Sequence, residues 1–147
     1  MKVLAVDPGD KRIGLAISDP TGTLARPLCV IRHQAREHDA EKIIEISQEE
    51  GAELILVGWA LDSEGQVGHQ ARKSQRLANA IRENSSIQVE MWDESNTTQD
   101  AINNQVLMGT RRKKRKDWID GIAACILLQD FLDQKSINDK HTRNEHG

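Results

Sequence analysis

Aromatic side chains are scarce in this 147-residue chain, which has three tryptophans, one phenylalanine and no tyrosine. Proteins that hold single-stranded bases by stacking need several exposed rings, so this composition argues against a base-stacking platform. Apolar residues still make up 37% of the chain, enough for a core at this length. The core is therefore expected to be aliphatic, built from Ile, Leu, Val and Ala.

Cysteine and long apolar runs are also in short supply. Cys29 and Cys125 lie in the apolar segments PLCVI and AACILL, without the CxxC or Cys/His spacing of a zinc site. We expect two buried, free thiols, as in a reducing cytosol. No run approaches transmembrane length, and Asp7 interrupts the first apolar stretch before it could act as a signal peptide. These absences predict a cytoplasmic protein with no membrane partner.

Net charge is low, at −3, but it is unevenly distributed. Residues 111–116 read RRKKRK, and the rest of the chain has 14 Lys and Arg against 23 Asp and Glu, a balance of −9. A basic segment on an acidic body indicates docking of a polyanion at one place, although such a run can also be a solvated loop. The predicted nucleic-acid contacts in this run are Arg111, Arg112, Lys113, Lys114, Arg115 and Lys116.

Hydrophobic periodicity predicts an ordered series of strands and helices. Short apolar runs separated by turn residues predict strands at 2–6, 13–18 and 24–31, the last with Pro27 at an edge or bulge. Further strands are expected at 52–60 and 87–93. Helical spacing predicts helices over 38–50, 67–81, 96–108 and 118–132.

This order predicts an α/β fold with a mixed five-stranded sheet. Three strands joined by tight turns form an antiparallel meander, and the α/β crossovers that follow add two parallel strands, with helices on both faces. The first strand is expected near the centre. We predict one domain over residues 1–135 and a disordered, polar C-terminal tail over 136–147.

Three acids lie where such a sheet could gather them. Asp7 ends the first strand, Asp93 and Glu94 end the last, and Asp120 shares a face with Ala124 and Leu127 on the final apolar helix. Sites of open α/β sheets lie at the carboxyl edge of the strands. Each acid also has an ordinary interpretation, as a turn former, a capping residue or a partner of the helix dipole.

Clustered carboxylates repel one another, and a divalent cation removes that penalty. Ligand sets made only of oxygen favour Mg²⁺ or Mn²⁺, and two such ions about 4 Å apart support phosphodiester cleavage. The hairpin after Asp7 would place Lys11, Arg12 and the Gly9 backbone beside a phosphate. The five histidines show no ligand spacing and are expected at the surface, with His69 the one candidate accessory base.

Four segments resemble the signature blocks of the YqgF (RuvX) family: VDPGDKRIGLAISD, ILVGWALDSEGQVGHQA, WDESNTTQDA and RRKKRKDWIDGIAACILLQDFLD. Members are named as pre-16S ribosomal RNA nucleases and as Holliday junction resolvases. The resemblance, from Val3 to about Asp133, implies an RNase H-like fold and a two-metal Mg²⁺ or Mn²⁺ site. It implies that the catalytic and metal-binding acids are Asp7, Glu94 (or Asp93) and Asp120.

The chain departs from the family pattern at two places. Ser95 stands where the family has the arginine of its D-E-R motif, and Gly58-Trp59-Ala60 replaces its G-L-P motif. The resemblance implies an RNA nuclease for the small-subunit ribosomal RNA precursor, a monomer or weak homodimer that binds structured RNA. The alternatives are a DNA endonuclease for Holliday junctions, which should dimerise, and a non-catalytic nucleic-acid-binding protein of the same fold.

Overall fold

A computed structural model of the protein describes residues 1–60, 64, 66–94 and 115–146, with the side chains of residues 115–120 and 137–146 left out. Five strands form one sheet in the order β3-β2-β1-β4-β5. Their bounds are β1 (Val3–Pro8), β2 (Arg12–Ser18), β3 (Ala25–Arg32), β4 (Leu54–Trp59) and β5 (Gln88–Asp93).

The strand directions confirm the predicted mixed sheet. β1 pairs antiparallel with β2, and β2 pairs antiparallel with β3, which gives the meander. β4 pairs parallel with β1, and β5 pairs parallel with β4. The first strand lies at the centre, as expected, because both the meander and the crossovers build outward from it.

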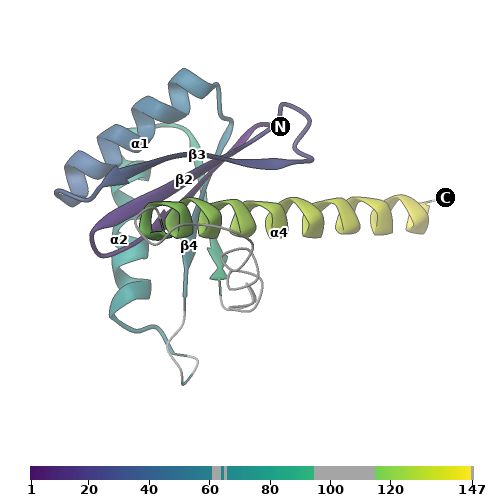
Figure 1. Ribbon diagram of the computed structural model, residues 1–147. Coiled ribbons are helices and arrows are strands. Elements are labelled where there is room, and N and C mark those ends of the chain that lie inside the picture. Colours follow the sequence, from purple (N-terminus) through teal and green to yellow (C-terminus); the bar gives the residue numbers. More distant parts are fainter. Residues whose placement is uncertain (61–63, 65, 95–114, 147) are drawn as a thin grey trace.

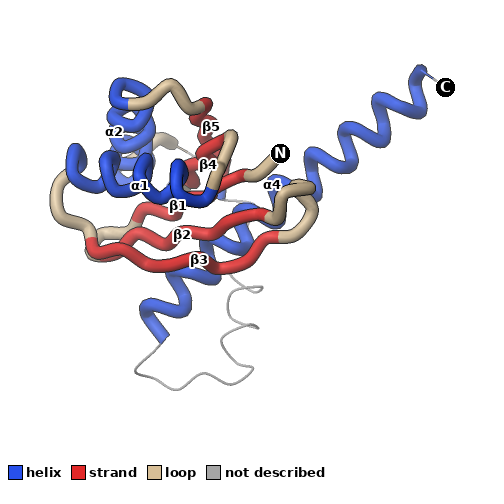
Figure 2. Tube along the Cα trace, turned by 90° about the horizontal axis from the view of Figure 1, so that it is seen from above, coloured by secondary structure: helices blue, strands red, loops and turns tan. Residues whose placement is uncertain are grey.

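Helices cover both faces of the sheet (Figures 1 and 2). α1 (Arg36–Glu50) and α2 (His69–Asn84) pack on one face, and α4 (Arg115–His146) crosses the other. α1 ends where Gly51 adopts a left-handed conformation with φ of 69°, as the sequence predicts for a helix stop. The helix predicted over 96–108 lies outside the described residues.

Alternation along β1 divides the core into two layers. Leu4 and Val6 pack toward α1 and α2, whereas Val3 and Ala5 pack toward α4. Side chains also alternate between the two faces along β4, where Leu54 and Leu56 lie on the α4 face. Odd-numbered positions of β1 and even-numbered positions of β4 therefore face α4, and this parity decides where the strand-end residues point.

The edge strand β3 corrects the expectation for the cysteines. Its register shifts opposite Leu15 and Ala16, next to Pro27, which confirms a bulged edge strand. Cys29 lies on this strand and is exposed, and Cys125 on α4 is half-buried. Both thiols are free, as predicted, but neither is buried, because an edge strand and the rim of a helix leave one side open to solvent.

The final helix is longer than predicted. α4 continues to His146, whereas the sequence analysis ends the helix at 132 and expects a disordered tail over 136–147. No glycine or proline occurs between Gly121 and Gly147, so nothing in the sequence breaks the helix. The C-terminal part of α4 projects beyond the sheet (Figure 1). No helix in the described part of the chain is both long and apolar enough to cross a membrane.

Candidate active site

The structure brings two of the three predicted acids together on the α4 face. Asp7 is near the carboxyl end of β1, and Glu94 directly follows β5. By the alternation of their strands, Asp7 continues the row of Val3 and Ala5, and Glu94 continues the row of Trp92. Asp93 has the opposite parity, so Glu94 is the acid of this pair that faces Asp7.

The strands that carry Asp7 and Glu94 are not neighbours, because β4 lies between them. One residue beyond the pair Val6 and Val57 of the parallel ladder, Asp7 stands beside Gly58. A Cβ atom at Gly58 would collide with Glu94 Oε1 and would lie 2.8 Å from Leu127 Cδ2. The Glu94 side chain therefore occupies the space that a side chain at position 58 would fill.

On its other side Asp7 pairs with Gly14 of β2. Because both neighbours in register are glycines, neither of them places a side chain beside this carboxylate on the α4 face. Glycine 58 of the segment Gly58-Trp59-Ala60 is thus a structural requirement of the acid pair. In the sequence this segment stands out only as a departure from the family pattern.

The electrostatics of the pair fit a bound cation. Burial, a hydrogen bond with Glu94 and the negative charge of Glu94 all raise the pKa of Asp7 well above its usual value. Glu94 Oε1 is buried, and among the described residues it has no hydrogen-bond partner. A buried carboxylate oxygen without a donor is costly, and a metal ion is one partner that would satisfy it.

The cation that suits this pair is a hard one. Both donors are carboxylate oxygens, which Mg²⁺ and Mn²⁺ accept. Among the described side chains, no three His, Cys, Asp or Glu residues converge on a cation-sized site. Asp7 and Glu94 therefore make up a pair, to which further ligands would have to be added.

Helix α4 lies across the row that contains Asp7. Val30 of β3, Gly14 of β2 and Asp7 of β1 are successive partners in register. At one end of this row, a Cβ on Gly121 would lie 3.8 Å from Val30 Cγ2, and at the other end Leu127 meets Gly58.

The third predicted acid, Asp120, belongs to the backbone of this helix, and its side chain lies outside the described part. Ala124 and Leu127, which share a helical face with position 120, are fully buried against the sheet. The fold thus brings the helix of Asp120 to the acid pair.

The predicted phosphate-contacting hairpin is a tight turn directly after Asp7. The backbone N–H of Gly9 donates to the carbonyl of Arg12 at 2.9 Å, and a Cβ on Gly9 would lie 2.5 Å from that oxygen. Close backbone approach therefore requires glycine here. Lys11 and Arg12 line a cavity of about 610 Å³ next to this turn.

Residues 111–114 of the basic run and Ser95 lie outside the described residues, as do the side chains of Arg115 and Lys116.

A second polar cluster, which the sequence did not predict, lies on the opposite face of the sheet. His33 Nδ1 contacts Asp39 Oδ2, and the backbone N–H of Gln34 donates to Asp39 Oδ1 at 3.1 Å. Asp39 is 2% exposed, so this histidine is held by a buried carboxylate and is not a plain surface residue. The five residues between them in sequence carry no recognisable motif, so only folding reveals the pair.

Solved structures of two resolvases share this fold. The chain is similar to Thermus thermophilus RuvC in complex with a Holliday junction substrate, with a TM-score of 0.57, 17% identity and coverage of 92% of this chain and 96% of that one. It is also similar to the fowlpox virus resolvase in complex with junction DNA, with a TM-score of 0.57 and 13% identity over 91% and 98% of the two chains. At these identities the likeness concerns the fold, which is RNase H-like.

Curated relatives cover nearly the whole chain. A Thermoanaerobacter pseudethanolicus protein named "Putative pre-16S rRNA nuclease" is 38% identical over 138 residues, 92% of this chain and 98% of its own length. A Clostridium botulinum protein of the same name is 35% identical over 136 residues, 92% and 99% of the two chains. The family model described as "RuvX: Holliday junction resolvase" matches residues 1–134. With a fold, an acid pair and relatives in agreement, this chain belongs to the RuvX family.

Proposed function

We propose that the protein is a divalent-metal-dependent nuclease that hydrolyses phosphodiester bonds in RNA, and that it processes an end of the 16S ribosomal RNA precursor in the cytoplasm. The observation that carries the proposal is the acid pair of Asp7 and Glu94, in which Glu94 Oε1 is buried and accepts no hydrogen bond from the part of the chain that the structure describes. The names of the relatives support the substrate, since proteins 35% to 38% identical over most of the chain are named for this RNA.

In this proposal Asp7 and Glu94 hold Mg²⁺ or Mn²⁺, and Asp120 completes the ligand set. Held there, a pair of such ions would supply activation of a water molecule and stabilisation of the leaving oxygen in phosphodiester hydrolysis. The fold itself positions the two carboxylates close together. Gly58 gives Glu94 its place, and the packing of α4 on the sheet fixes the surroundings of both acids.

Cationic side chains would hold the RNA backbone beside these acids. Lys11 and Arg12 follow Asp7 in the adjoining turn, and the basic run 111–116 precedes Asp120 in the chain. Such contacts grip phosphates without reading sequence. Neutralising Arg112, Lys113 and Arg115 is therefore expected to weaken RNA binding and to flatten its dependence on salt. An unchanged salt slope would argue that the run is only a solvated segment.

The decisive test compares the wild type with Asp7→Asn on single-stranded and structured RNA, in Mn²⁺ and in EDTA. Cleavage by the wild type in Mn²⁺, and its loss in EDTA or in the variant, would support the proposal. Equal cleavage by both proteins would point to a contaminating nuclease. Binding without cleavage by the wild type would favour a non-catalytic nucleic-acid-binding protein, a reading to which Ser95 gives some weight.

A Holliday-junction-type DNA endonuclease is the second candidate. The family description and the likeness to junction-bound resolvases favour it. A junction-resolving enzyme must place two active sites on two strands, so it should form a dimer. Cleavage of a four-way DNA junction by a dimeric species, with no cleavage of RNA, would replace the RNA assignment. A strict monomer that cuts RNA would exclude the resolvase activity.

A further inference from the structure

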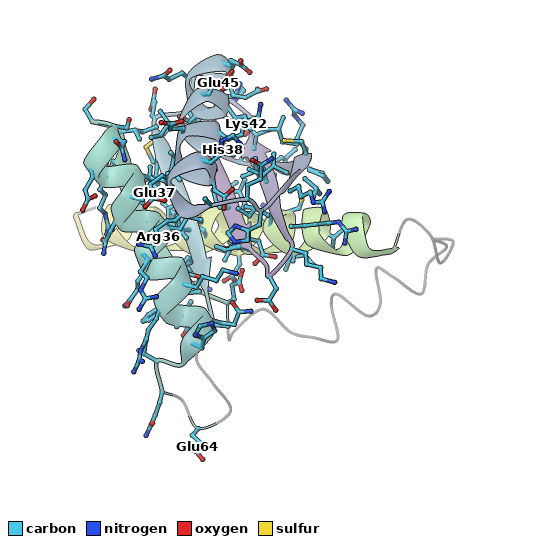
Figure 3. All side chains as sticks on the ribbon, turned by 90° about the vertical axis from the view of Figure 1, so that its left-hand side faces the viewer. Arg36, Glu37, His38, Lys42, Glu45 and Glu64 are labelled. Atoms are coloured by element: carbon cyan, nitrogen blue, oxygen red, sulfur yellow. The ribbon has the colours of Figure 1, made fainter. Side chains whose placement is uncertain are left out.

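A cavity of about 280 Å³ opens at the same end of the sheet as the acid pair, but on the face covered by α1 and α2. Pro8, Ile13 and Leu77 contribute apolar walls. The remaining lining is mainly cationic or imidazole-bearing, and it comes from two separate parts of the chain: His33, Arg36, His69, Lys73 and Arg76. Figure 3 shows Arg36 at the end of α1 that lies beside α2.

A second cavity, of about 610 Å³, adjoins the first through a shared wall at His33. Its basic side chains are Lys11, Arg12 and Arg32. Together the two cavities form what we call the basic groove, which is lined by Lys11, Arg12, Arg32, His33, Arg36, His69, Lys73 and Arg76.

The charge balance of the basic groove is strongly positive. It holds six Lys and Arg residues, and the acids among its described lining residues are Asp10 and Asp39. Asp10 is exposed and lies 3.7 Å from Lys73 Nζ, and it also accepts from Gln70 at 2.9 Å. Asp39 is buried and engaged with His33. Neither acid cancels the excess of positive charge, so the groove suits an anion.

The fold holds the shared wall in place. Because Asp39 contacts Nδ1 of His33, a buried group orients the imidazole, which lines both cavities. The first residue of α2 and the N-cap residue of α1 also line the cavity, and neither helix start has a side-chain cap. Helix starts without such caps favour negative charge nearby.

The position of the basic groove relates it to the candidate active site. Pro8 and Gly9 line the first cavity, and they directly follow Asp7 in the chain. Asp7 faces α4, and Pro8 alternates to the face of α1 and α2. A strand with one phosphate at the acid pair would therefore reach the groove by turning around the end of β1.

We propose that the basic groove binds the backbone phosphates of the RNA strand that occupies the active site, on the side of the sheet remote from the acids. The inference rests on the proposed function for the identity of the polyanion. It adds Arg32, His33, Arg36, His69, Lys73 and Arg76 to the surface that holds the substrate. The apolar walls leave room for sugar or base between phosphates, so contact with the groove needs no particular sequence.

The test measures binding of a fluorescein-labelled single-stranded oligoribonucleotide by anisotropy over a series of salt concentrations. All proteins carry Asp7→Asn, so the probe is not cut and the outcome does not depend on whether the wild type is a nuclease. The test variant adds Arg36→Gln, Lys73→Gln and Arg76→Gln. The matched control adds the same loss of charge at exposed sites away from the groove: Arg26→Gln, Lys42→Gln and Lys135→Gln.

Neutralising the groove is expected to weaken binding by at least about 10-fold and to reduce the slope of log affinity against log salt by about 2, since each lost phosphate contact in a single strand removes about 0.7. The control is expected to change affinity less than about 3-fold. Equal affinities and slopes for the two triple variants would overturn the proposal.

Arg76→Gln alone supplies a second test, because Arg76 is exposed and its replacement leaves the core untouched. It should reduce the salt slope by about 0.7. If cleavage by the otherwise wild-type protein is absent while the groove variants still lose RNA affinity, the nuclease proposal fails and the groove stands. If cleavage occurs and the groove variants bind normally, the groove alone fails.

Discussion

The carboxylates of Asp7 and Glu94 meet although their strands are separated by a third strand. Adjacent strands are about 4.8 Å apart, so residues two strands apart normally do not touch. Glycine at position 58 of the intervening strand removes the obstacle, and the longer glutamate side chain spans the gap. The fold thereby holds two acids in a contact that is unfavourable when both are ionised, which is the arrangement expected of a cation site.

The first prediction concerns stability in the absence of metal. Because the native pKa of Asp7 is raised, the folded protein holds this proton more tightly than the unfolded chain, whose aspartate titrates near about 3.9. Stability is therefore lost as pH rises from about 4 through the native pKa. In EDTA, Asp7→Asn is expected to unfold at a higher temperature than the wild type at pH 7, and at about the same temperature near pH 4.

Thermal unfolding followed by circular dichroism, with and without Mn²⁺, checks this prediction. Mn²⁺ should raise the melting temperature of the wild type and leave that of Asp7→Asn unchanged, since binding to the native state alone is stabilising. If Asp7→Asn is less stable than the wild type at pH 7 in EDTA, the ionised carboxylate of Asp7 does not destabilise the fold, which would contradict this prediction.

The second prediction concerns Gly58→Ala. The added methyl group would collide with the carboxylate of Glu94 and press on Leu127 at 2.8 Å, so Glu94 must move away from Asp7. We expect stability to fall by about 1–3 kcal/mol, as for other overpacked sites. Mn²⁺ affinity, measured by calorimetry, should fall by roughly 10- to 100-fold, as for loss of residues that orient metal ligands.

Gly121→Ala is the matched control for this substitution. Its Cβ would meet Val30 at 3.8 Å and Pro27 at 4.0 Å, which are ordinary contacts, and alanine is favoured over glycine within a helix by about 1 kcal/mol. This variant is expected to be as stable as the wild type or more so. Tight Mn²⁺ binding by Gly58→Ala would show that Glu94 does not need the space above position 58.

The third prediction concerns the docking of α4. Phe131 is 8% exposed and packs edge-on against Trp92, with ring centroids 5.2 Å apart, and Trp92 Nε1 donates to Asp130 Oδ2 at 3.0 Å. Phe131→Ala leaves a cavity between helix and sheet and should cost about 3–5 kcal/mol. Urea unfolding measures the loss, and the exposed neighbour Gln134→Ala should change stability by less than about 0.5 kcal/mol.

The fourth prediction concerns Asp39. Replacing it by alanine leaves the backbone N–H of Gln34 without its acceptor and His33 without its partner. The expected loss is about 1–3 kcal/mol in unfolding free energy. Glu41→Ala, an exposed acid on the same helix, should be close to neutral. Equal effects of the two substitutions would show that the contact of His33 with Asp39 contributes no stability.

Much of the fold could be predicted from the sequence because its signals are local. Alternation and turn residues locate the strands, and the meander followed by crossovers leaves few topologies. Local signals fail where the outcome depends on distant partners. Cys29 lies in an apolar segment, yet it is exposed, because its strand lies at the sheet edge. The length of α4 also escapes prediction, since its last residues lack the apolar periodicity on which the prediction depends.

The sequence by itself determined which residues are candidates for the chemistry: an acid at the end of a buried strand, an acid after another, and a basic run before an apolar helix. Only the tertiary structure decided that Glu94 rather than Asp93 faces Asp7, because strand parity and the gap at Gly58 set that choice. It alone placed His33, Arg36, Lys73 and Arg76 around one cavity. Residues far apart along a chain become neighbours only when the sheet and its helices are packed, so no local sequence pattern predicts these contacts.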